Sequence, residues 1–179
     1  EKEDLIDFLE AQAGQPDSRI SPEELRLAKN SLLFGDKIVR DVMTPITKTK
    51  LVLADDSVGP VLMSELHESG HSIFPVRAKK HSHDIVGVLS LHDLEEAKAG
   101  GPVRDYMRKK INYINDELTL DVALNEFIKT RHHLFVVMNN IDEVVGVVAV
   151  DDILGQIVGE TISALSEADN TDNEGQSQE

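Results

Sequence analysis

The chain carries the same pattern of residues twice, and this internal repeat constrains its fold more than any other feature. Residues 39–43 read Val-Arg-Asp-Val-Met, and residues 103–107 read Val-Arg-Asp-Tyr-Met, about 60 positions further along. Three further matches follow in the same order: 71–76 with 132–137, 85–89 with 144–148, and Asp93 with Asp152. Two copies of a unit of about 60 residues predict a duplicated supersecondary module rather than a solenoid.

Each copy predicts the element order β-α-β-β-α. In the first copy, a short strand over 51–53 precedes a helix with Ser57 as its N-cap and Gly70 as its C-terminal stop. The second copy begins with a short strand at 113–114, followed by a helix with apolar positions between 118 and 128. Two β-branched, aliphatic strands and a closing helix complete each copy. These strands are predicted over 72–76, 85–89, 134–138 and 144–149, and the closing helices begin near Leu91 and Val150.

The segments outside the repeats predict helices before them and a polar tail after them. An acidic amphipathic helix is expected over 3–12, and the Ser-Pro-Glu-Glu sequence at 21–24 is a capping box for a second helix that ends at Gly35. From about Glu167 the chain is polar and acidic, which predicts disorder. The expected organisation is a helical linker, two repeats and an acidic disordered tail, over 1–37, 38–98, 99–160 and 161–179.

Composition excludes several classes of function. Lysine and arginine total 18 against 33 aspartate and glutamate residues, and the net charge of −15 argues against a duplex nucleic-acid binder. The absence of cysteine excludes disulfides, thiolate metal sites and a cysteine nucleophile. No hydrolase triad, P-loop or Gly-x-Gly-x-x-Gly motif appears, so no enzyme activity is expected. His81 and His83 have a spacing that can chelate a metal, but loop histidines without an acidic partner are usually solvated, so no metal site is expected.

The repeated unit resembles the CBS domain, and two units in tandem resemble a CBS pair, or Bateman module, over about residues 38–158. The flanking segments 20–24, 33–36 and 39–45 are similar to the segment that enters the CBS pair of the HlyC/CorC family, which includes the CNNM magnesium transporters. The resemblance implies an α+β fold with two CBS repeats, β-α-β-β-α each, related by a pseudo-twofold axis and preceded by N-terminal helices.

The resemblance also implies a cytosolic regulatory module that binds ATP or another adenine nucleotide, with Mg²⁺ held by its phosphates. The parent chain would attach this module to a transmembrane domain at the cytoplasmic face of the plasma membrane, and would transport magnesium or another divalent cation. A first residue other than methionine favours a piece of a longer protein. The alternative function is a structural homodimerisation module with vestigial nucleotide pockets. In either case a homodimer through the repeats is expected, because apolar helix positions such as Leu62, Leu66, Leu124 and Phe127 are predicted to be partly uncovered in one chain.

The motif at the end of each copy carries the expected chemistry. Glycines at 87 and 146 are predicted to let a ligand approach the strand closely. In the CBS family a Ser/Thr-x-x-Asp motif follows that strand, with its hydroxyl on a phosphate and its carboxylate on the ribose, and Ser90 and Asp93 match it in the first copy. The alternative reading is that such a serine is a helix N-cap and such an aspartate a first-turn acid.

Two inter-repeat clefts are therefore expected. One joins Asp152 to Thr44, Pro45 and Ile46, with Ala149 where the family has a hydroxyl. The other joins the Ser90 motif to Arg108 and Lys109, which are candidate phosphate-binding cations or else a solvated loop. The cleft with Thr44 is favoured as the nucleotide site. Candidate apolar walls for adenine are Ile73, Phe74, Pro75, Leu134 and Phe135.

Overall fold

Two small sheets with the same strand arrangement form the body of the protein, as the repeat predicts. The structure, a computed structural model, describes residues 1–82, 84–96 and 100–159. The first copy consists of β2 (Val52–Leu53), α4 (Pro60–Glu68), β3 (Ile73–Arg77), β4 (Ile85–Ser90) and α5 (Leu91–Glu96). The second consists of β5 (Tyr113–Asn115), α6 (Leu120–Thr130), β6 (Leu134–Met138), β7 (Val144–Ala149) and α7 (Val150–Val158). In each copy a parallel pair, β2–β3 or β5–β6, is followed by an antiparallel pair, β3–β4 or β6–β7.

The segment that enters each copy pairs with the sheet of the other copy. The first passes through α3 (Val39–Val42), β1 (Thr44–Pro45) and the 3-10 helix η1 (Ile46–Lys48), and β1 lies antiparallel to β7. The second passes through η2 (Val103–Asp105), after which Arg108 forms a bridge with Val88 of β4. This reciprocal pairing joins the copies about an approximate twofold axis, which confirms the predicted fold.

Glycine is required where each entering segment crosses the neighbouring strand. A Cβ atom at Gly146 would lie 2.5 Å from the carbonyl oxygen of Thr44, and one at Gly87 would lie 2.9 Å from the carbonyl oxygen of Arg108. Real Cβ atoms are not found that close to backbone oxygen. The sequence interpretation of these glycines as points of ligand approach is therefore wrong, because the protein's own backbone occupies that space.

Each sheet has its own hydrophobic core, and the short helices contribute to it. Leu66 of α4 is fully buried, and Phe127 of α6 is 3% exposed with its ring centroid 4.3 Å from that of Phe135. The prediction that these two residues lie on an uncovered face is wrong, since each packs against its own sheet. The apolar side chains that remain exposed on the same helices are Val61, Val122 and Ile128.

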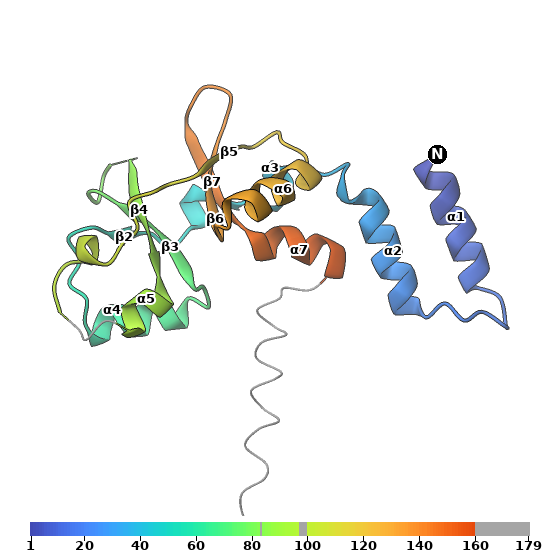
Figure 1. The fold of residues 1–179 in the computed structure, drawn as a ribbon, viewed down its shortest axis with the longest axis horizontal. Helices are drawn as coiled ribbons and strands as arrows, with labels where there is room; N and C mark the ends of the chain where they lie inside the picture. Colours follow the sequence, from blue (N-terminus) through green and yellow to red (C-terminus); the bar gives the residue numbers. More distant parts are fainter. Residues whose placement is uncertain (83, 97–99, 160–179) are drawn as a thin grey trace, which may run out of the picture.

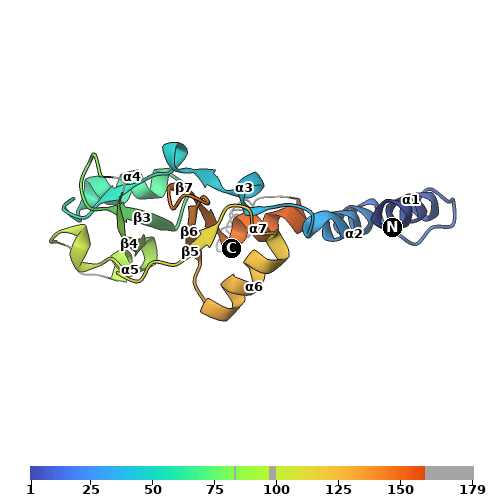
Figure 2. The ribbon, with the colours of Figure 1, turned by 90° about the horizontal axis from the view of Figure 1, so that it is seen from above.

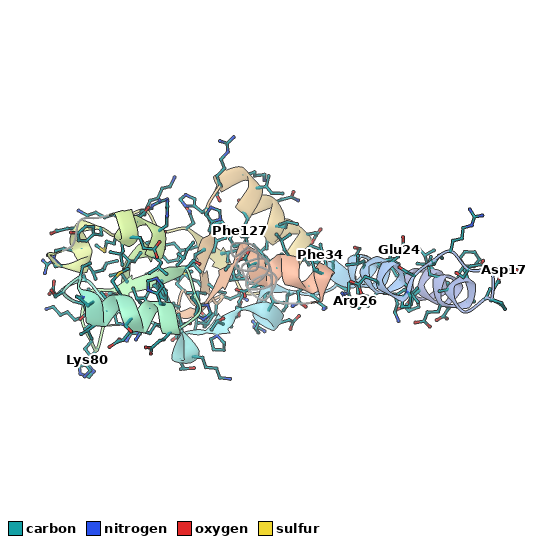
Figure 3. The ribbon with its side chains drawn as sticks, turned by 90° about the horizontal axis from the view of Figure 1, so that it is seen from below. Asp17, Glu24, Arg26, Phe34, Lys80 and Phe127 are labelled. Atoms are coloured by element: carbon teal, nitrogen blue, oxygen red, sulfur yellow. The ribbon has the colours of Figure 1, made fainter. Side chains whose placement is uncertain are left out.

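Two N-terminal helices form an arm that extends from the second copy (Figures 1 and 2). The helices α1 (Lys2–Ala13) and α2 (Pro22–Phe34) confirm the two predicted helices, and the Ser21 hydroxyl and Glu24 carboxylate accept each other's backbone N–H as the capping box predicts. Figure 3 shows Phe34 at the inner end of this arm and Asp17 at its tip. Phe34 is buried in the core of the second copy, so α2 is anchored to the body of the protein.

Local differences from the predicted elements are small. The helix expected to have Ser57 as its N-cap has Gly59 there and begins at Pro60, because proline favours the first helical position. Ser57 forms a bridge with Pro102 instead. The predicted acidic tail and His83 lie outside the described residues.

Candidate functional site

A cavity of about 560 Å³ lies between the two copies, on the side where β1 crosses β7. This volume falls in the range of small-molecule sites, which is roughly 300–1,000 Å³. Its lining residues come from both copies, so an occupant would contact both. They are Thr44, Thr49, Lys50, Gly70, His71, Ser72, Ile73, Phe74, Pro75, Ser90, His133, Leu134, Val147, Ala149, Val150, Asp151 and Asp152.

The cavity brings together many of the residues predicted for the cleft with Thr44. Those that line it are Thr44, Ile73, Phe74, Pro75, Ser90, Leu134, Ala149 and Asp152. Ser90 was expected in the other cleft, yet it lines this one from the end of β4. The predicted residues outside the lining are Pro45, Ile46, Asp93, Arg108, Lys109 and Phe135. Phe135 is 3% exposed within the core, which removes it as a wall for adenine.

Matching hydrogen bonds fix the two strand–helix turns that line the cavity. The backbone N–H of Leu91 donates to the carbonyl of Ser72 at 2.8 Å, and that of Val150 donates to the carbonyl of His133 at 3.1 Å. Each bond ties the start of a closing helix to the residue before the central strand of the same copy. The residues that precede these helices, Ser90 and Ala149, are therefore held in equivalent positions at the cavity wall.

Asp152 is a partly buried carboxylate on this wall. Its Oδ2 accepts a hydrogen bond from the backbone N–H of Ala149 at 2.8 Å, and its place in the first turn of α7 fits the alternative reading of such an aspartate as a first-turn acid. Burial raises the pKa of Asp152, while the Ala149 N–H and the nearby His71 lower it to a smaller extent. Because burial has removed water from this carboxylate, a ligand that donates hydrogen bonds to it would restore part of its lost solvation.

The cavity also holds basic side chains that the sequence reasoning missed. Lys50 lies two residues before β2, and its Nζ donates to Oε2 of Glu65 at 2.9 Å. His71 and His133 lie before β3 and β6, at the same rim. These three residues could have been identified from their positions just before predicted strands, because the strand ends of the two copies meet at the cavity.

In the other predicted cleft, two of the predicted residues bind each other. The Arg108 guanidinium donates from Nε to Oδ2 of Asp93 at 3.0 Å and from a terminal nitrogen to Oδ1 at 3.1 Å. The predicted phosphate cation is thus bound to the predicted ribose carboxylate. Both carboxylate oxygens of Asp93 accept from Arg108, whereas the Ala149 N–H donates to Oδ2 of Asp152.

The described residues show neither a metal-binding cluster nor a membrane-spanning helix. Within residues 1–82, 84–96 and 100–159, histidine, aspartate and glutamate form no group of three or more suited to a metal ion. In the same part of the chain, none of the helices combines the length and apolar character that crossing a bilayer requires.

Comparison with known proteins identifies related sequences. A protein-family model described as the CBS domain matches residues 103–159. A UPF0053 protein of Mycobacterium tuberculosis is 30% identical over 157 residues, which cover 84% of this chain and 35% of that protein. The magnesium and cobalt efflux protein CorC of Escherichia coli K12 is 30% identical over 142 residues, which cover 78% of this chain and 48% of CorC. The chain therefore spans between about a third and a half of the length of these curated relatives.

Solved structures share the fold over most of the chain. The CBS domain of a bacterial CNNM/CorC family Mg²⁺ transporter matches with a TM-score of 0.72 at 22% identity, covering 89% of this chain and 97% of that one. A CBS domain of such a transporter in complex with ATP matches at 0.66 and 25% identity, covering 78% and 99%. The CBS domain of a putative transporter from Clostridium difficile 630 is 31% identical with a TM-score of 0.59, covering 70% and 97%.

Proposed function

This chain belongs to the CorC/CNNM family of CBS-domain proteins, and we propose that it is the adenine-nucleotide-sensing regulatory segment of a divalent-cation transporter. The observation that carries the proposal is the cavity between the two copies, which Thr44 enters from the first and Asp152 from the second. A relative with 25% identity has been solved with ATP bound, which supports a nucleotide as the occupant. The transported ion would be magnesium or another divalent cation, in line with the names of the relatives.

Each part of an adenine nucleotide finds suitable groups in the cavity. Ile73, Pro75 and Leu134 offer apolar surface for the base. The Asp152 carboxylate suits the two ribose hydroxyls, since a carboxylate accepts hydrogen bonds from both. The phosphates would lie near the N-terminus of α7 and the hydroxyl of Ser90. The Ser90 hydroxyl would replace the one that is missing at Ala149. Mg²⁺ would be held by those phosphates rather than by a cage of protein ligands.

Contacts to both copies give the nucleotide a means of regulation. A ligand that binds one relative orientation of the copies better than another shifts the population toward it. The helix α7 lines the cavity with its first residues and packs against α2 near its end, where Asn30 donates to the carbonyl of Ile157 and Lys37 donates to Gln156. We propose that α2 carries this orientation to a membrane domain of the parent protein, at the cytoplasmic face of the membrane.

A structural homodimerisation module is the second candidate. Val61 is 75% exposed on α4 and Ile128 is 66% exposed on α6, and apolar side chains at such positions favour a contact between two copies of the chain. The missing hydroxyl at Ala149 also favours a vestigial pocket. Homodimerisation is compatible with nucleotide sensing, so dimerisation in the absence of any nucleotide binding is what would distinguish this candidate.

Calorimetric titration with ATP, ADP and AMP, each with and without Mg²⁺, tests the proposal. At least one of these nucleotides should bind with a stoichiometry of one per chain, because the other cleft holds the Arg108–Asp93 pair. Light scattering at tens of micromolar protein, roughly the range of a weak interface, measures dimerisation in the same samples. A dimer that binds none of the nucleotides would establish the structural module in place of the sensor.

A further inference from the structure

We infer that Lys50 is the cation that selects nucleoside polyphosphates over monophosphates in the cavity, and that it leaves Glu65 to bind the terminal phosphates. The inference rests on the proposed function and specifies its ligand class. It begins from the ion pair between Lys50 Nζ and Glu65 Oε2, in which Lys50 lines the cavity and Glu65 lies outside the lining. The cations predicted from the sequence, Arg108 and Lys109, do not line the cavity, so neither supplies this charge.

A polyphosphate in this cavity needs positive charge from the protein. The chain has a net charge of −15, and the cavity is lined by the carboxylates of Asp151 and Asp152. Among the described residues that line it, Lys50 is the one whose side chain carries a permanent positive charge near neutral pH. His71 and His133 contribute nitrogen donors at the same rim. Ammonium–phosphate hydrogen bonds are stronger than those between neutral groups, so Lys50 would dominate the recognition of added phosphates.

The movement of Lys50 from Glu65 to a phosphate is favourable because the ion pair with Glu65 is weak. The Lys50 and Glu65 side chains are 38% and 53% exposed, and ion pairs of that exposure contribute little to stability. The backbone before Lys50 is fixed, since Thr49 Oγ1 donates to the carbonyl of Pro45 at 2.9 Å. The four-carbon stem of lysine can therefore reorient its ammonium group while the chain that carries it stays in place.

The movement of Lys50 away from Glu65 would also change the charge on the outer face of α4. Glu65 lies four residues after Val61, so the two side chains share one face of that helix. When Lys50 turns to the nucleotide, Glu65 loses its counter-charge beside the exposed Val61. Polyphosphate binding would in this way change the charge of the surface that is proposed to meet a second copy of the chain.

Charge-neutral variants of the ion pair test the inference in the full chain. Lys50→Gln should weaken ATP binding about tenfold and AMP binding far less, because AMP lacks the terminal phosphates. Glu65→Gln should strengthen ATP binding about threefold by freeing Lys50, and should have no effect when combined with Lys50→Gln. Matched controls on the same segments are Lys48→Gln and Glu68→Gln, which remove equal charges outside the cavity lining. Circular dichroism should show that all variants remain folded.

The outcomes separate this inference from the function on which it rests. If adenine nucleotides bind but Lys50→Gln behaves like Lys48→Gln, Lys50 is not the selecting cation and the nucleotide-sensing proposal stands. If Lys50→Gln weakens ATP and AMP equally, Lys50 supports binding without selecting polyphosphates, and the inference is overturned. If the unaltered chain binds none of the nucleotides, the proposed function and the inference fall together.

Discussion

The two clefts between the copies share one backbone plan but differ in what occupies them. In one, the entering segment places Thr44 beside Gly146, and Asp152 lies on the wall of an open cavity. In the other, the equivalent segment places Arg108 beside Gly87, and its guanidinium binds both oxygens of Asp93. The sequence repeat therefore duplicates the backbone arrangement around a site without duplicating the side chains that line it. The side chain at the crossing position differs, since Thr44 lines the cavity and Arg108 pairs with the repeat aspartate.

The largest expected effect comes from removing the carboxylate in each cleft. Asp152→Asn should weaken ATP binding by on the order of 2–4 kcal/mol, because it weakens two charge-assisted hydrogen bonds to the ribose. Asp93→Asn should leave ATP affinity nearly unchanged, since Arg108 already satisfies that carboxylate. Calorimetry measures both, with Asp142→Asn in an exposed turn as the control. An equal or larger loss in Asp93→Asn would reverse the assignment of the open cleft.

Gly146 and Gly87, where an entering segment crosses a strand of the other copy, should tolerate even one added methyl group poorly. Gly146→Ala should lower the free energy of unfolding by about 1–3 kcal/mol, the usual cost of forcing extra volume into a packed site. Gly87→Ala should cost less, because its nearest neighbour is the flexible Met107 side chain and its nearest backbone oxygen is 2.9 Å rather than 2.5 Å away. Urea unfolding measures the difference. Gly59→Ala, which meets no atom within 4 Å, is the control, and a loss in Gly146→Ala no larger than in this variant would contradict the crossing model.

The sequence was sufficient to predict the fold because the relevant signals are local. The strands at 134–138 and 144–149 have the predicted bounds, since each is a valine-rich run that borders the turn at 139–140 or the start of α7. The predicted N-cap of α4, Ser57, lies two residues before the observed one, Gly59, because the sequence offers two accepted helix-start signals, Ser57 and Pro60. The packed face of α4 was also misjudged, since periodicity identifies Leu66 as apolar but does not show what covers it.

The sites were harder to predict because they depend on contacts between the copies. The repeat motif identified Asp93 and Asp152 as equivalent, and nothing in the local pattern shows that only one has an arginine across the joint. Lys50 was missed for the same reason, since it reaches the cavity only when the two strand ends meet. The apolar walls were partly identified, yet the division between Leu134 at the cavity and Phe135 in the core follows from strand register.

A second pair of equivalent ion pairs extends the comparison to stability. Arg40 donates from Nε to Oδ2 of Asp116 at 2.8 Å, and Arg104 pairs with Asp55, so each entering segment is tied to the opposite copy. Asp116 is 3% exposed, whereas the Asp55 side chain is 64% exposed, and the hydrogen bond to Asp116 is the main reason that the pKa of Arg40 is raised.

Neutralising each arginine should therefore have unequal effects. Arg40→Gln should lower the melting temperature by several degrees, because it leaves the Asp116 carboxylate buried without a counter-charge. Arg104→Gln should change the melting temperature very little, as is usual for exposed ion pairs. Thermal unfolding followed by circular dichroism compares them, and equal shifts would show that burial of the acid does not decide the strength of these links.

The smallest expected effect distinguishes the outer helices of the two copies by their response to pH. His67 of α4 contacts Glu95 of α5 at 3.0 Å, whereas the matching position of α6 is Ile128, which does not titrate. The pKa of His67 is raised, first by its hydrogen bond to the carbonyl of Met63 and then by Glu95. A raised folded-state pKa stabilises the protein below the unfolded pKa, and this stabilisation is lost as the pH rises through the folded pKa.

The unaltered chain should thus melt at a slightly higher temperature than His67→Gln near about pH 5, and at nearly the same temperature near about pH 8. Glu95→Gln should reduce that difference, and a difference that does not change with pH would mean that His67 stabilises α4 by packing alone.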